Sequence, residues 1–388
     1  MRTLIISDLH LGSASGADLL RSAAVRGELL DALAGIDRLV LLGDLLELRH
    51  GPRRDALLAA RPFFSALRSK LSGGELVLVA GNHDHALVER WLHRRAESLS
   101  PQPLSAQQLM RPSECSSLAA EIARWVSPLK VSVAYPGLWV RDDVYATHGH
   151  YLDCHLTVPT MERIAIAAMG RLVRKRAESF GCVDDYEAVC APVYAWVEEV
   201  AAHGSTRAAL NGTTTVAMWR VLHREEWRTR RRAGAGASAR DRVLQARSAM
   251  RETAVRVAFP LAVRGLNRAG LGPLRPVVSP DELRRAGLAA LREVAERLGL
   301  RQAHVVFGHT HRPGPLPGDL MEEWEGRLGA RLYNCGSWTY SPSFLGETAA
   351  ESPYWPGGCV LVEEQGPPQV RRLLAHCSSA ELRQACAR

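Results

Sequence analysis

Long apolar runs and paired cysteine motifs are missing from this 388-residue sequence. It has no stretch of about 18 apolar residues, which excludes a typical transmembrane helix. The first residues, 1–11, lack the pattern of a signal peptide, so we expect them to belong to the folded protein. The eight cysteines are scattered without a Cys-x-x-Cys pair, which argues against a zinc ribbon or a disulfide framework. These features predict a cytoplasmic protein with reduced thiols.

Aromatic residues are also few, whereas basic residues are plentiful. Aromatics make up 6% of the chain, and no patterned stacking platform accompanies the basic stretches. The net charge is +8, and residues 155–300 contain 24 Lys and Arg against 15 Asp and Glu. This surplus favours anionic partners such as nucleotides, nucleic acid or acidic lipid headgroups. A solvated, arginine-rich helical surface without a partner is the alternative.

Strand and helix signals alternate in the N-terminal part and return near the C-terminus. Helical patterns cover roughly 17–34 and 53–70. We predict strands at 3–7, 39–42, 75–80, 130–134, 143–147, 303–307, 331–335, 358–363 and 370–374. Alternation of this kind is typical of an α/β fold whose site lies at the carboxyl ends of the strands.

The region between these strands has a different character. Residues 155–300 are rich in Ala and Arg and give helical signals. One boundary is sharp, because Ser279-Pro280-Asp281-Glu282 places Ser at the N-cap, Pro at the first helical position and Glu two positions later. We therefore predict one core formed by residues 1–154 and 301–388, interrupted by a helical cap or insertion at 155–300.

Two stretches of this insertion combine apolar and basic residues, at 158–175 and 253–275. A basic amphipathic helix can lie on an anionic membrane surface, which would place the protein at the membrane periphery. A cap whose apolar faces pack against each other explains the same pattern, and its arginines could then hold a substrate phosphate.

Five polar clusters stand at or near the ends of predicted strands. They are Asp8-Leu9-His10, Gly43-Asp44 with Glu47 nearby, Gly81-Asn82-His83-Asp84, His148-Gly149-His150 and Gly308-His309-Thr310-His311. Charged and imidazole groups directly after buried strands are costly unless they are compensated, and this placement recurs in all five clusters. Imidazole and carboxylate ligands without Cys suit Mn, Fe or Zn.

In their order, these clusters resemble the five-motif signature of the calcineurin-like metallophosphoesterase superfamily, over roughly residues 1–150 and 300–340. The resemblance implies a four-layer sandwich of two mixed β-sheets flanked by helices, with a large helical insertion. It also implies two divalent metal ions, with manganese favoured and Fe, Zn or Mg as alternatives. One ion would be bound by Asp8, His10, Asp44 and His311, and the second by Asp44, Asn82, His148 and His309.

The resemblance further implies a reaction. A hydroxide shared by the two ions would attack the phosphorus of a phosphoester or pyrophosphate. His83 is the candidate acid that protonates the leaving group, and we expect Asp84 to orient its imidazole. We expect Glu47 to support the site without binding a metal, and His150 and Arg312 to contact the substrate.

Finer residues resemble the group around UDP-2,3-diacylglucosamine pyrophosphatase. The matching segments are Asp8–Gly12, Gly43–Glu47, Gly308–Pro313 and Asn334–Trp338. These enzymes cleave a pyrophosphate in a lipid A precursor, and a helical insertion covers their site. Here His83 stands where that group has Arg, and the insertion is far longer. The resemblance thus implies a small or lipid-linked, nucleotide-type phosphate as the substrate.

Two alternative functions stay open. A metal-dependent nuclease could use the basic insertion to hold a phosphate backbone. A non-catalytic scaffold could keep the fold and recruit partners through the insertion, but such a protein should have lost metal ligands, and every expected ligand is present.

Overall fold

The computed structural model describes residues 1–71, 73–202, 258–277, 279–342, 345, 348–349 and 352–386. The strands are β1 (Thr3–Ile6), β2 (Arg38–Leu42), β3 (Glu75–Val79), β4 (Gln107–Met110), β5 (Lys130–Arg141), β6 (Val144–Thr147), β7 (His304–Phe307), β8 (Arg331–Asn334), β9 (Gly358–Val362) and β10 (Gln369–Arg372). All the strands predicted from the sequence are present, and β4 was not predicted.

The α-helices are α1 (Ala23–Ala32), α2 (Arg53–Lys70), α3 (Glu89–Ala96), α4 (Pro112–Cys115), α5 (Ser117–Trp125), α6 (Met161–Leu172), α7 (Val183–Ala202), α11 (Pro280–Arg297) and α12 (Ser379–Cys386). Short 3-10 helices are η1 (Leu19–Arg21), η2 (His85–Leu87), η3 (His150–Cys154), η4 (Ala177–Ser179) and η5 (Met321–Trp324).

The strand β5 belongs to two mixed sheets. Its first half pairs parallel with β3 and antiparallel with β4, while its second half pairs antiparallel with β6. The first sheet has the order β10-β9-β1-β2-β3-β5, and β6, β7 and β8 continue the second sheet in parallel. A single long strand therefore connects the two sheets, which could not be read from its short predicted segment.

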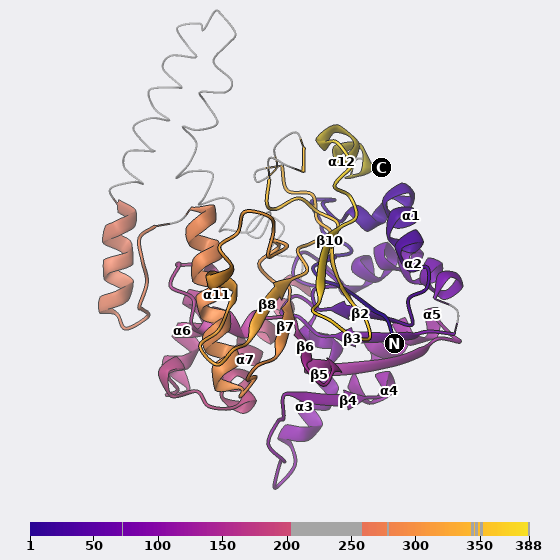
Figure 1. Ribbon diagram of the computed structural model, residues 1–388. Helices are drawn as coiled ribbons and strands as arrows, with labels where there is room; N and C mark the ends of the chain where they lie inside the picture. The colour runs from indigo at the N-terminus through magenta and orange to yellow at the C-terminus, as the bar shows by residue number, and fades with distance from the viewer. Residues whose placement is uncertain are drawn as a thin grey trace, which may run out of the picture.

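Three apolar clusters separate four layers. One cluster joins the two sheets, with Val40 and Val79 from the first and Leu138 and Val306 from the second. Another packs the outer face of the first sheet against α1, α2 and α5. The third packs the second sheet against α11, and Figure 1 shows α11 and α1 on opposite sides of the sheets. The predicted four-layer sandwich of two mixed β-sheets is confirmed.

The described part of the predicted insertion is mainly helical and contains α6, η4, α7, a helix at 258–268 and α11. The predicted start of α11 is confirmed, because the Ser279 hydroxyl accepts a hydrogen bond from the backbone N–H of Glu282 at 3.1 Å. The beginning of the stretch 253–275, up to residue 257, lies outside the described residues. The division of the chain at 154/155 and 300/301 stays a prediction.

Among the described residues, no helix combines the length and the apolar character that a membrane crossing requires. Peripheral contact between the insertion and a membrane also stays a prediction.

Candidate metal centre

The polar clusters predicted from the sequence meet in space. Asp8 and His10 follow β1, Asp44 follows β2, Asn82 and His83 follow β3, His148 follows β6, and His309 and His311 follow β7. Carboxyl ends of neighbouring parallel strands lie at one edge of a sheet, and here the edges of both sheets contribute. All seven expected metal ligands are therefore gathered at one site.

The backbone at this site is unusual. Among the described residues, seven that are not glycine have a positive φ. Five of the seven are expected metal ligands, namely Asp8 (56°), His10 (45°), Asp44 (50°), His309 (64°) and His311 (60°). Such backbone conformations are uncommon for residues other than glycine and persist where the surrounding structure holds them, often at functional sites.

Two glycines allow the loops to approach each other. A Cβ atom at Gly81 would lie 2.1 Å from Asp44 Oδ1, and one at Gly308 would lie 2.0 Å from Ser7 Oγ and 2.5 Å from Asp8 Oδ2. All three distances are shorter than a non-bonded contact, so any side chain at these positions would displace a carboxylate of the site.

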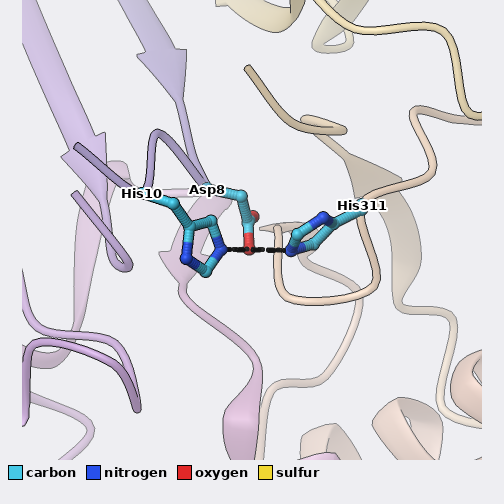
Figure 2. A group of neighbouring side chains, drawn as sticks. All are labelled: Asp8, His10 and His311. Atoms are coloured by element: carbon cyan, nitrogen blue, oxygen red, sulfur yellow. Dashed lines mark hydrogen bonds and ion pairs between the residues drawn. The ribbon is translucent and has the colours of Figure 1, made fainter. Parts of the chain in front are cut away.

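One group of side chains consists of Asp8, His10 and His311 (Figure 2). His311 Nε2 lies 3.1 Å from Asp8 Oδ1, and His10 Nε2 lies 3.8 Å from the same oxygen. Asp8 Oδ1 is buried and has no hydrogen bond of good geometry from the described residues. Burial alone would raise the pKa of Asp8, but the imidazoles of His311 and His10 hold it well below the ordinary value. The carboxylate is therefore ionised and available to a cation.

A second group contains Asp44, Asn82, His148 and His309. His148 Nε2 lies 3.3 Å from Asp44 Oδ2, and the side-chain amide of Asn82 lies 3.1 Å from both His148 Nε2 and His309 Nδ1. With its NH₂ turned inward, Asn82 can donate to both rings and to Asp44. With its oxygen turned inward, the Asn82 oxygen faces Asp44 Oδ2 and the lone pairs of His148 Nε2 and His309 Nδ1. These four acceptors repel one another, and a bound divalent cation would remove the repulsion.

In three imidazoles, the ring nitrogen that faces away from the other expected metal ligands, here called the outer nitrogen, contacts an oxygen. His148 Nδ1 lies 3.0 Å from the carbonyl oxygen of Leu42, His309 Nε2 lies 3.0 Å from Asp153, and His10 Nδ1 lies 2.9 Å from Glu47. Because these oxygens accept hydrogen bonds, the outer nitrogen carries the proton. In the neutral ring, the inner nitrogen then offers its lone pair, as in the carboxylate–histidine–metal arrangement.

All three of these histidines hold protons strongly when no metal is bound. Burial lowers the pKa of His10, but Asp8 and Glu47 raise it well above its ordinary value. Burial lowers the pKa of His148, but the carboxylate of Asp44 more than offsets this effect and raises it to about 9. Burial likewise lowers the pKa of His309, but Asp153 raises it above the ordinary value. Metal binding must displace such protons, because only the neutral ring is a ligand.

His83 lies next to this centre, with its Nε2 4.0 Å from Asp44 Oδ2. The sequence predicts that Asp84 orients its ring, but the structure places Glu47 there, with both carboxylate oxygens 2.9 Å from His83 Nδ1. Asp84 instead accepts hydrogen bonds from backbone N–H groups of the site loops, those of Gly81, Asp44, Leu45 and Leu46. Burial, together with the nearby Arg49, lowers the pKa of His83 to about 4.

Glu47 contacts both His10 and His83 and is buried, and its role in supporting the site without binding a metal stays a prediction. A third group of possible ligands, formed by His10, Asp44 and His83, overlaps the other two through Asp44 and His10. In all three groups, the ligand atoms lie within 4.8 Å of one another. The donor set thus fits divalent metal ions, and Asp44 belongs to two of the three groups, the one with His10 and His83 and the one with His148 and His309.

The two residues expected to contact substrate have other partners. The Arg312 guanidinium forms a bidentate pair with Asp319 at 2.6 and 2.9 Å and lies over Trp324. His150 is buried among the rings of Tyr135, Tyr151 and Tyr194. Substrate contact by Arg312 or His150 stays a prediction.

Sequence reasoning missed two buried residues of this site, Asp153 and Arg49. Asp153 lies in η3, three residues after His150, and its proximity to the His148 motif was the one available signal. Arg49 stands two residues after Glu47, and its NH1 lies 3.3 Å from the amide of Asn82 when that amide presents its oxygen to Arg49.

A family model described as calcineurin-like phosphoesterase matches residues 1–205, which include five of the seven expected metal ligands and His83. No curated protein matches the chain.

Proposed function

Because this chain belongs to the calcineurin-like phosphoesterase family, we propose that it hydrolyses a phosphoester or pyrophosphate bond with the help of two divalent metal ions. One ion would be held by Asp8, His10, Asp44 and His311. The other would be held by Asp44, Asn82, His148 and His309.

The observation that carries this proposal is the direction of the lone pairs. Oxygen partners occupy the outer nitrogens of His10, His148 and His309, so the inner nitrogens face Asp8, Asp44 and Asn82. Bound divalent cations would supply an activated water and neutralise charge on the phosphoryl oxygens. Manganese is our first choice, and Fe, Zn or Mg would suit the same donors.

The protein's own part in the reaction is to position the groups and transfer a proton. Glu47 fixes the ring of His83 through Nδ1, which leaves Nε2 on the side of Asp44. We assign His83 Nε2 to proton transfer to the leaving oxygen, and Glu47 rather than Asp84 to its orientation. Donation from Nε2 requires the doubly protonated ring, which the carboxylates of Glu47 and Asp44 favour against the burial that lowers its pKa. Asp84 holds the loops after β2 and β3 together through its backbone hydrogen bonds.

For the substrate, we propose a small or lipid-linked, nucleotide-type phosphate, as in the UDP-2,3-diacylglucosamine pyrophosphatase group. This choice fits a cytoplasmic protein. If the substrate is lipid-linked, the protein would also contact the membrane surface. The nuclease and the scaffold remain the alternatives, and the nuclease would require salt-dependent binding of DNA or RNA.

The test is hydrolysis of bis-p-nitrophenyl phosphate with and without Mn²⁺, in the wild type and in Asp44→Asn. We expect turnover that needs the metal and falls by about a thousandfold or more in the variant, because Asp44 would contact both ions. A folded wild type that binds two metal ions but hydrolyses no phosphoester or pyrophosphate would instead support the scaffold.

A further inference from the structure

One buried cation beside the candidate centre lacks an ionic partner at hydrogen-bonding distance. Arg49 is only 6% exposed, and its Nε is buried without a hydrogen bond among the described residues. Its NH1 lies 3.7 Å from Glu162 of α6, which is beyond hydrogen-bonding distance. The guanidinium carbon lies 5.3 Å from the centre of the Tyr194 ring of α7.

The other two buried arginines of the described chain have hydrogen-bond partners within 3.2 Å, whereas the nearest carboxylate oxygen to Arg49 lies at 3.7 Å. Arg312 binds both oxygens of Asp319, at 2.6 and 2.9 Å. Arg163 donates to the carbonyl oxygens of Leu156 and Gly272, at 2.8 and 3.2 Å. A buried charge without such partners is costly. The cost at Arg49 would be removed by an anion that enters the site.

The orientation of the Asn82 side-chain amide decides whether Arg49 has a hydrogen-bond partner there. When the amide nitrogen of Asn82 faces His148 and His309, its oxygen accepts a hydrogen bond from Arg49 NH1 at 3.3 Å. When the oxygen instead faces a metal ion, the amide nitrogen turns toward Arg49, and two donors then face each other. Metal binding would therefore release Arg49 to bind a negatively charged group at the centre.

We propose that Arg49 binds a non-bridging oxygen of the substrate's phosphoryl group. This inference rests on the proposed function and adds a substrate-binding residue to it. A guanidinium matches phosphoryl oxygens in both charge and geometry. Because Glu162 and Tyr194 flank the guanidinium, helices α6 and α7 of the insertion take part in positioning the bound phosphate.

The test measures binding of inorganic phosphate to the Mn²⁺-loaded protein by isothermal titration calorimetry. The variants are Arg49→Met and Arg49→Gln, which both remove the charge, and Arg54→Met is the control because Arg54 is an exposed arginine at the start of α2. We expect phosphate affinity to fall about tenfold to a hundredfold in both Arg49 variants, as for loss of a charge-assisted hydrogen bond. Mn²⁺ affinity and the affinity of the control should stay near those of the wild type.

Wild-type phosphate affinity in Arg49→Met would overturn the proposal, and Arg49→Gln decides by the same criterion if the Met variant does not fold. A parallel loss of Mn²⁺ affinity would overturn it as well, because Arg49 would then support the metal ligands. Phosphate binding that depends on Arg49, in a wild type that hydrolyses no phosphoester or pyrophosphate, would uphold this inference and refute the proposed hydrolase. An increase in KM for bis-p-nitrophenyl phosphate, larger than the decrease in kcat, would support both.

Discussion

The core side of the candidate centre and the joint between the core and α7 are built in different ways. On the core side, short loops after the strands hold the ligands on backbone with positive φ, as at Asp8 and Asp44. At the joint, side chains make the connection. Glu187 of α7 accepts hydrogen bonds from the hydroxyls of Tyr135 and Tyr151, at 2.6 and 2.5 Å.

This difference indicates how each region should respond to an amino-acid substitution. Where the backbone itself sets the positions of ligands, one added atom can displace several of them at once. Where side chains make the connection, a substitution removes one contact and leaves the rest in place. We therefore expect abrupt losses of metal binding on the core side and graded losses of stability at the joint.

The largest effect is expected for Gly308→Ala. The added Cβ would lie 2.5 Å from Asp8 Oδ2 and 2.0 Å from Ser7 Oγ, so the loop after β7 must shift and carry His309 and His311 with it. We expect Mn²⁺ affinity, measured by isothermal titration calorimetry, to fall by about a hundredfold or more. The shift would both overpack the loop and misplace groups that orient the metal ligands.

Gly27→Ala is the matched control, because a Cβ at that position in α1 meets no atom within 4 Å. The same substitution there should leave Mn²⁺ affinity unchanged and stabilise the helix by about 0.5–1 kcal/mol. Equal Mn²⁺ affinities for the two alanine variants would contradict the view that the backbone sets the positions of the metal ligands on the core side.

A smaller effect is expected for Asp153→Asn, which changes the outer partner of His309. Asparagine keeps an oxygen that can accept from His309 Nε2 but removes the charge that contacts this ring at 3.0 Å. We expect Mn²⁺ affinity to fall about tenfold to a hundredfold, the range for partners that orient metal ligands. Asp143→Asn, at a carboxylate paired with Arg141 away from the centre, should bind Mn²⁺ like the wild type.

The smallest effect on the site is expected for Glu187→Gln, which weakens the joint. Burial raises the pKa of Glu187, but hydrogen bonds from His85, Tyr135 and Tyr151 hold it below its ordinary value of 4.5. We expect the free energy of unfolding to fall by about 1–3 kcal/mol at neutral pH, with Mn²⁺ affinity unchanged.

The pH dependence of that loss gives a further check. A carboxylate whose pKa is lowered by folding stabilises the protein above its unfolded pKa, and this contribution disappears as the pH falls through the folded value. The stability difference between wild type and Glu187→Gln, measured by urea unfolding, should therefore shrink below about pH 4.5. A difference that stays constant down to pH 3 would show that the charge of Glu187 does not stabilise the joint.

Much of the core side could be predicted from the sequence, because each ligand lies within a few residues of a strand end. The motif order also identified the four-layer sandwich through its resemblance to a known family. The partner of His83 could not be predicted this way. Asp84 is its neighbour in sequence, but the turn directs that carboxylate to backbone N–H groups, and Glu47 reaches His83 from another loop.

Contacts between distant segments could not be predicted for the same reason. The contact between Asp153 and His309 joins η3 to the loop after β7, and Arg49 meets Tyr194 across the joint with α7. Periodicity and motif spacing describe neighbours along the chain, whereas these pairs depend on how the insertion packs on the core. The double role of β5 in both sheets was hidden for a related reason, since only part of that strand gave a clear apolar pattern.

We propose that two metal ions lie on either side of Asp44. Anomalous diffraction at the manganese edge, from crystals of the Mn²⁺-loaded protein, tests it most directly. We expect two peaks, both within bonding distance of Asp44, with His10 and His311 beside one and His148 and His309 beside the other. A single peak, or two peaks of which only one contacts Asp44, would contradict the account.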